Sequence, residues 1–218
     1  MVNLRPFRDY DEKDVINLFA LDTSLLDTAI TTWDTRVPAG SLVELSTSGW
    51  HYDDEIFDIG TQVAAGDYSV NNVTSDRWGV NAKVQLCEQS NSGVLGMMLN
   101  HVALVDENGE QLKHNPRKAS EMEAVLPWQA VPVVRRGIFL VQSDALTGQT
   151  FNAGATLTAH RTGNNDGDFD TTAPSSGETL VGYTLGSNHQ TAGNADHHTS
   201  HLILLDIGAP ATSGATSA

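Results

Sequence analysis

Two strand-like segments in residues 131–160 constrain the fold of this chain more than any other stretch. The first, residues 133–141, is bulky and apolar but is interrupted by Arg135, Arg136 and Gly137. The second alternates strictly, with Ala155, Leu157 and Ala159 on one side and Thr156, Thr158 and His160 on the other. A period of two indicates a half-buried strand, and a glycine inside a strand indicates a bulge or a bend at a barrel corner. We therefore expect Leu157 in the core and Thr158 in solvent.

Similar strand signals recur along the chain. Residues 80–87 alternate in the same way, which places Leu86 in the core and Lys83 in solvent, with Gln85 also facing out. Further strand-like runs cover residues 41–45, 94–99, 101–105, 180–185 and 202–207, and Asn108-Gly109 marks a hairpin turn. Many short strands joined by polar loops are typical of antiparallel sandwiches and barrels. We predict an all-β fold, an antiparallel β-sandwich or barrel, with a short helix near residues 119–126, capped by Ser120 and stopped by Pro127.

Composition divides the chain into three segments. Residues 37–207 carry the strand signals and form the predicted β body. The apolar side chains of residues 1–36 lie outside any alternating pattern, and residues 11–21 have the spacing of one or two helical turns. We therefore predict that residues 1–36 are an extended N-terminal docking arm separate from the body. Residues 208–218 contain only small and turn-forming types and are predicted to be a flexible tail.

The charge and cysteine content exclude several functions. The formal net charge is −15, with 27 acidic and 12 basic residues. Binding to a phosphate backbone requires dense Lys and Arg, so nucleic acid is not an expected partner. The sequence has neither an apolar run of the ~20 residues that cross a bilayer nor the apolar core of a secretory signal, so we expect no membrane contact and synthesis in a cytoplasm. Cys87 is the single cysteine, and we expect it to be a small buried side chain.

Histidines near the C-terminus are the first candidate for a metal site. His197, His198 and His201 lie close together beside Asp196, and imidazole with carboxylate can bind zinc. The segment lacks the Glu of a His-Glu-x-x-His site, and its composition predicts a loop rather than a helix. The expected state is a solvated loop, and the alternative is a weak or interfacial metal site.

Acidic and basic clusters give the remaining candidates for a site. The acidic stretch 166–170 fails the EF-hand frame, so we expect a hairpin tip, with an irregular Ca²⁺ site as the alternative. The carboxylates of Asp53, Asp54 and Glu55 are adjacent on a predicted loop, where they are expected to solvate rather than to catalyse. For Arg135 and Arg136 we expect ion pairs within this acidic chain, and the alternative is an anchor to a neighbouring subunit. No motif of a nucleophile elbow, a P-loop or a dinucleotide fold is present, and we assign no catalytic, cofactor-binding or metal residues.

Two parts of the sequence resemble virion proteins of tailed bacteriophages. The opening LRPFRDYDEKDVINLF, residues 4–19, resembles the start of structural proteins of marine and cyanobacterial phages. The body resembles capsid decoration, or cement, proteins at a Gly-led strand (40–43), Val-Leu-Gly (94–96), Arg-Gly-Ile (136–138), an Ala-Gly-x-x-Leu step (153–157) and Leu-Val-Gly-Tyr-x-Leu (180–185). The resemblance implies a protein of the outer capsid surface that binds the major capsid protein, often as a homo-oligomer, a dimer or a trimer, at local symmetry axes. It implies no catalytic residues.

The expected function is therefore that of a non-enzymatic decoration protein without a cofactor, which stabilises contacts between major capsid subunits. The alternatives are another virion part, such as a head fibre, neck or tail subunit that binds a host glycan, and a metal-dependent hydrolase built on the histidines. In the favoured interpretation the arm binds the capsid through Arg5, Phe7, Arg8, Tyr10, Val15, Ile16, Leu18 and Phe19.

Overall fold

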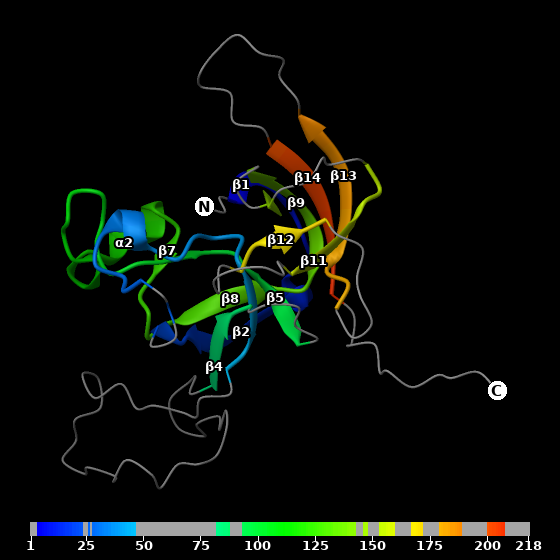
Figure 1. The fold of residues 1–218 in the computed structure, drawn as a ribbon. Coiled ribbons are helices and arrows are strands. Elements are labelled where there is room, and N and C mark those ends of the chain that lie inside the picture. Colours follow the sequence, from blue (N-terminus) through cyan, green and yellow to red (C-terminus); the bar gives the residue numbers. More distant parts are fainter. Residues whose placement is uncertain are drawn as a thin grey trace, which may run out of the picture.

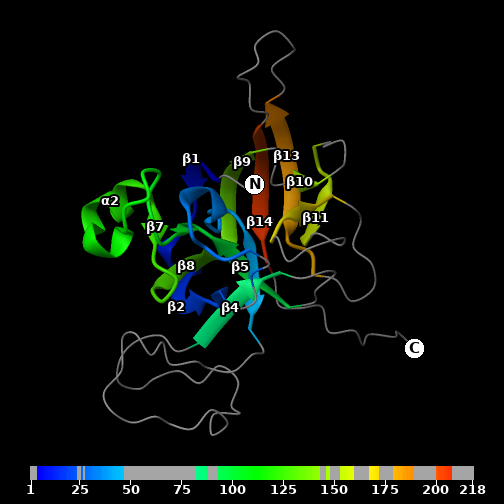
Figure 2. The ribbon, with the colours of Figure 1, turned by 60° about the vertical axis from the view of Figure 1, so that its left-hand side comes forward.

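The structure is a computed structural model, and it describes residues 4–23, 26, 28–46, 82–87, 93–142, 146–147, 153–159, 167–171, 179–188 and 200–207. In these residues the predicted all-β fold is confirmed: two main β-sheets account for most of the strands, and one short α-helix lies to the side (Figure 1). The helix α2 (Pro116–Glu121) lies at one side of the molecule, apart from the hairpin of β13 (Gly182–Asn188) and β14 (Ser200–Asp206) (Figure 2).

The larger sheet has seven strands in the order β1-β9-β14-β13-β11-β12-β10. In chain order they are β1 (Leu4–Asp9), β9 (Arg136–Gln142), β10 (Leu146–Thr147), β11 (Thr156–Ala159), β12 (Phe169–Asp170), β13 (Gly182–Asn188) and β14 (Ser200–Asp206). All neighbours are antiparallel except β10 and β12. The strand β1 is therefore an edge strand, and its proline and charged residues suit an edge because they discourage further pairing.

The second sheet is a closed five-stranded barrel in the order β2-β4-β3-β5-β8. Its strands are β2 (Val15–Leu21), β3 (Leu42–Leu45), β4 (Ala82–Leu86), β5 (Val94–Met98) and β8 (Ala130–Val134). Closure depends on β2, which pairs parallel with β4 and antiparallel with β8. A closed sheet has no free edge, so each of these strands is held on both sides.

The prediction that residues 1–36 form an arm outside the fold is wrong for Leu4–Leu21. The strand β1 pairs with β9, β2 completes the barrel, and only the 3-10 helix η1 (Glu12–Asp14) replaces the expected helical turns. Leu21 is 2% exposed in the barrel interior. A register shift between Ile16 and Phe19 breaks the alternation of β2, and for this reason the sequence pattern did not predict a strand there. The predicted tail, residues 208–218, lies outside the described residues.

Two apolar cores hold these layers together. One fills the space between the inner face of the seven-stranded sheet and the outer wall of the barrel, and its largest members include Phe139, Phe169, Met97 and Leu42. The other fills the barrel. Cys87 belongs to the first core at 4% exposure, and burial raises the pKa of its thiol, so the predicted role of a small buried side chain is confirmed.

The chain passes from the barrel to the larger sheet at one corner, between β8 and β9. Arg135 forms this corner: its N–H donates to the Asp14 carbonyl (3.0 Å), and its own carbonyl accepts from the N–H of Ile207 (3.0 Å). Gly137 follows with φ +148°, and a Cβ there would lie 2.7 Å from the carbonyl oxygen of Asp9. The bend that the sequence predicts at this glycine therefore lies where two sheets meet, and the close approach of β1 requires the glycine.

A small side cluster contains the short helix α2 (Pro116–Glu121), the parallel pair β6 (His101–Val102) and β7 (Ala124–Val125), and the 3-10 helices η3 (Trp33–Thr35) and η4 (Leu112–His114). The helix was expected near residues 119–126 but begins three residues earlier, because Asn115 caps it by accepting from the N–H of Lys118 (3.2 Å) and Pro116 fits its first turn. It ends before Pro127 because Glu123 has φ +49° and β7 follows directly.

The predicted strand faces are confirmed for the apolar residues and wrong for two polar ones. Leu86 and Leu157 are in the core at 8% and 0% exposure, and Lys83 is half-buried. Thr158, expected in solvent, is 1% exposed, and its hydroxyl donates to the Asp170 carbonyl (3.5 Å). Gln85 is also buried, and its amide donates to a carboxylate oxygen of Glu44 (2.7 Å). Alternation predicts an exposed second face only where nothing covers it, and here both faces are covered.

Candidate functional site

The two arginines predicted to bind a capsid lie on β1 and are partly enclosed. Arg8 forms an ion pair with Glu123, and its Nε donates to the carbonyl of Arg5 (3.4 Å). Arg5 is half-buried. Arg8 therefore already has a carboxylate partner within the chain, which reduces what it can contribute to an acidic partner surface.

Three of the predicted docking residues point outward and are large and apolar. Phe7 on β1 is 54% exposed, and Leu18 on β2 is 53% exposed. Tyr10, just after β1, is 38% exposed and stacks on Phe139 with ring centroids 5.8 Å apart and an interplanar angle of 22°. These side chains are held by ordered strands yet keep much of their surface in water.

The other three predicted docking residues lie on β2 and belong largely to the body. Val15 packs against the core between the sheets, Phe19 packs against the barrel interior, and Ile16 is half-buried. They stabilise the barrel and are not free to bind a partner. The predicted set of eight residues is therefore split by the fold into outward and inward members.

Next to Arg8 lies a histidine that the sequence analysis did not single out. The Nδ1 atom of His101 accepts a hydrogen bond from the N–H of Ala39 (2.9 Å). Burial lowers the pKa of His101 from 6.5 to about 4, the positive charges of Arg36 and Arg8 act in the same direction, and Glu123 opposes them. His101 is therefore neutral at neutral pH and serves as a structural acceptor.

A second outward feature, also missed, is the apolar outer face of the seven-stranded sheet. Residues directly paired across antiparallel strands lie on the same face. Leu204 of β14 is paired with Ile138 on one side and with Tyr183 on the other, and Leu202 is paired with Leu140. With Leu185, which lies at a register shift beside them, these residues form what we call the apolar face: Ile138, Leu140, Tyr183, Leu185, Leu202 and Leu204.

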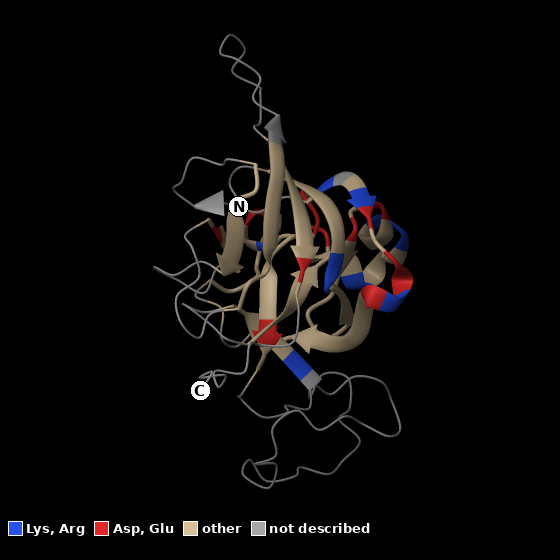
Figure 3. Cartoon of the chain, turned by 90° about the vertical axis from the view of Figure 1, so that its right-hand side faces the viewer, with Lys and Arg blue, Asp and Glu red and all other residues tan. Residues whose placement is uncertain are grey.

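The members of the apolar face are half-buried or exposed, with Tyr183 at 38% and Leu185 at 42%. In the view onto this side the strands are mostly uncharged, and charged residues gather instead around α2 and its loops (Figure 3). The signal was present in the sequence. Residues 138–141 and 202–205 are apolar at every position, and such runs indicate strands that are apolar on both faces.

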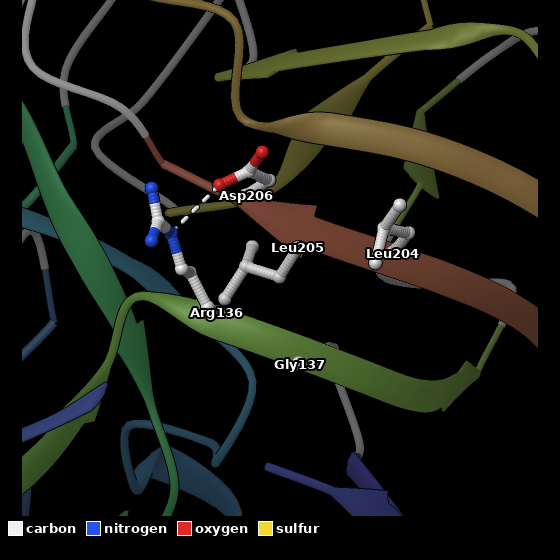
Figure 4. A pocket seen from close by; sticks show the side chains of 5 residues that line it. All are labelled: Arg136, Gly137, Leu204, Leu205 and Asp206. Atoms are coloured by element: carbon white, nitrogen blue, oxygen red, sulfur yellow. Dashed lines mark hydrogen bonds and ion pairs between the residues drawn. The ribbon is translucent and has the colours of Figure 1, made fainter. Parts of the chain in front are cut away.

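One end of the apolar face is closed by an ion pair. The Nε of Arg136 is 2.9 Å from an Oδ1 of Asp206, on paired positions of β9 and β14 (Figure 4). This confirms the expected ion pair for Arg136. Beside it Gly137, Leu204 and Leu205 line an open hollow of about 380 Å³. The hollow holds one cation and one anion already bonded to each other and adds no further polar group, so it offers little to orient a polar ligand.

The candidate metal ligands are not brought together in the part of the chain that the structure describes. His201 is 4% exposed inside β14, while His197 and His198 lie outside the described residues. Residues 169–170 form β12 with buried side chains, so the predicted hairpin tip is wrong there, and Asp166 is not described. Asp53, Asp54 and Glu55 also lie outside the described residues. Among those that are described, no group of three His, Cys, Asp or Glu side chains could hold a metal ion.

Comparison with protein-family models, with curated proteins and with solved structures found no match to this chain. Within the described residues, no helix has the length and apolar content needed to cross a membrane.

Proposed function

We propose that this chain is a non-enzymatic structural protein of a phage virion that binds the outer surface of the capsid and stabilises contacts between major capsid subunits. The observation that carries the proposal is the outward placement of Phe7 and Leu18, each more than half exposed, on strands that are fixed in the body. Large apolar side chains exposed on rigid elements are suited to protein contacts because little ordering is needed on binding. The resemblance of the opening residues to phage structural proteins is the reason for proposing a phage capsid as the partner.

Binding through these residues differs from binding through a free arm. An arm loses conformational entropy when it docks, whereas β1 and β2 are ordered before any partner arrives. About half of each Phe7 or Leu18 side chain remains to be buried, so each contributes roughly half of the 1.5–3 kcal/mol of a fully buried side chain. Loss of one of them should therefore weaken binding about threefold to tenfold.

The test is co-sedimentation of the purified chain with undecorated capsids. Phe7→Ser and Leu18→Ser are compared with Asp9→Ala and Asn17→Ala, which alter exposed polar residues on the same two strands. We expect all four variants to melt close to the wild type. The two apolar variants should bind more weakly and the double variant about tenfold to a hundredfold more weakly. Unchanged binding of the double variant, or wild-type protein that stays in the supernatant, would contradict the proposal.

A further inference from the structure

We propose that the apolar face is an interface with a second copy of this chain, in which two seven-stranded sheets pack face to face. This goes beyond the proposed function and does not rest on it, because Phe7 and Leu18 are not part of the apolar face. Four of the six members lie on the central strands β9 and β14, and Tyr183 and Leu185 extend the face over β13.

Charge favours a second copy as the occupant. The chain has a net charge of −15, so two copies repel wherever their acidic surfaces meet. The six residues of the apolar face carry no charge, and the ion pair at its end is neutral overall. Asp9, which is paired with Ile138, lies at the edge of this face on β1 and is exposed. An isologous contact requires that a surface be complementary to itself. Apolar side chains meet that requirement in any copy, and Arg136 with Asp206 supplies both signs, so the centre of the contact buries no unmatched charge.

The dimensions of the sheet indicate how strong this contact can be. The strands β9, β14 and β13 each have seven residues, which gives a length of about 24 Å. Three strands are about 14 Å wide, so the apolar centre covers about 340 Å². The flanking strands β1 and β11, with six and four residues, raise this to about 500 Å². A stable interface of standard size needs about 800 Å² per partner. The expected result is therefore a reversible dimer with a dissociation constant in the micromolar range rather than a permanent one.

The direction in which dimer affinity changes with salt distinguishes this dimer from one held by ion pairs. Added salt screens the repulsion between two anionic copies, and it leaves burial of the apolar face unchanged or strengthens it. The dimer should therefore tighten as NaCl is raised. A contact made by opposite charges would weaken under the same change.

The experiment is sedimentation velocity of the full chain up to about 200 µM at low and high NaCl, with melting curves for every variant. The test variant is Tyr183→Glu with Leu185→Glu, which puts four carboxylates into each dimer at positions that are already well exposed. The matched control is Leu45→Glu, an equally drastic change at an exposed leucine on β3. We expect at least tenfold weaker dimerisation for the test variant and no change for the control. Leu185→Ser, which is milder, should show a smaller loss if the double variant melts early.

Two results would overturn the inference: a wild type that is monomeric throughout, or a dimer that persists in the test variant. If the wild type is monomeric and the test variant also loses capsid binding, the apolar face belongs to the capsid contact and not to a second copy.

Discussion

Leu21→Ala distinguishes an integrated β2 from a detachable arm. Leu21 is 2% exposed inside the barrel, on the strand that joins β4 to β8. If β2 belongs to the fold, truncating this side chain leaves a cavity in a closed barrel that cannot easily collapse. If residues 1–36 were an arm, Leu21→Ala would leave the unfolding free energy of the isolated protein unchanged. The matched control is Leu18→Ala, three residues away on the same strand but 53% exposed.

The expected magnitudes differ by severalfold. Truncation of a fully buried leucine removes its transfer free energy and adds a cavity term, and such changes cost about 2–5 kcal/mol. Closure of the barrel around Leu21 places the expected value in the middle of that range. The exposed control should cost about 0.5 kcal/mol, as is usual for surface positions. A domain of this size has an unfolding free energy of about 5–15 kcal/mol, so the core variant remains folded but is visibly weakened.

The assay is urea unfolding followed by tryptophan fluorescence and far-UV circular dichroism, with the free energy extrapolated to water. The reasoning is refuted if the two variants agree within about 0.5 kcal/mol. If residues 1–36 were a separate arm, their deletion should leave a folded body. The observed pairing of β2 predicts instead that the deletion abolishes folding, because the barrel loses a strand.

Three further predictions concern a threonine, a histidine of β6 and a pair of histidines. Thr158→Ala should cost about 1–2 kcal/mol in urea unfolding because Thr158 is buried, less than Leu157→Ala at about 2–5 kcal/mol, whereas an exposed Thr158 would give a value near zero. His101 is expected to reduce stability between pH 6.5 and 4: its folded pKa is lowered to about 4, so the unfolded chain binds more protons in that window and up to about 3 kcal/mol is lost as pH falls. His101→Asn keeps an acceptor for Ala39 and should lack this part of the pH dependence when the two unfolding curves are compared. Replacement of His197 and His198 by Asn should leave the melting temperature unchanged, and a large fall in the melting temperature of the wild type on adding a chelator would instead reveal a structural metal.

Local patterns in the sequence were sufficient to predict the class of fold and the positions of most strands. Strict alternation located β4 and β11, and the Asn108-Gly109 turn is present, with Gly109 at φ +84° between Val105 and Gln111. The sequence could not show whether another part of the chain covers each face of a strand. A polar residue at an alternating position is exposed only if no other part of the chain covers it. Thr158 and Gln85 are buried and bond to Asp170 and Glu44, which lie on other strands.

The same limit applies to the candidate site. The docking residues were chosen because they did not fit an alternating pattern, yet a register shift inside β2 gives an irregular pattern to a strand that is fully part of the barrel. The apolar face was overlooked for the opposite reason. Its runs in β9 and β14 are uniformly apolar, and a sequence alone cannot say whether the second face of such a strand meets another layer or solvent.

Gly182→Ala tests the strand pairing on which the apolar face depends. Gly182 lies between Leu205 of β14 and Leu157 of β11, and a Cβ there would overlap the carbonyl oxygen of Leu204 and lie 3.2 Å from the Cα of Leu205. Both contacts are backbone atoms of a paired strand, so β13 and β14 must separate to admit the methyl group, and we expect a loss of several kcal/mol. Gly186→Ala is the control in the same strand, since nothing lies within 4 Å of its added Cβ. It should be neutral or up to about 1 kcal/mol stabilising, because alanine restricts the unfolded chain. Urea unfolding measures both, and equal values for the two variants would show that β13 is not packed against β14 as described.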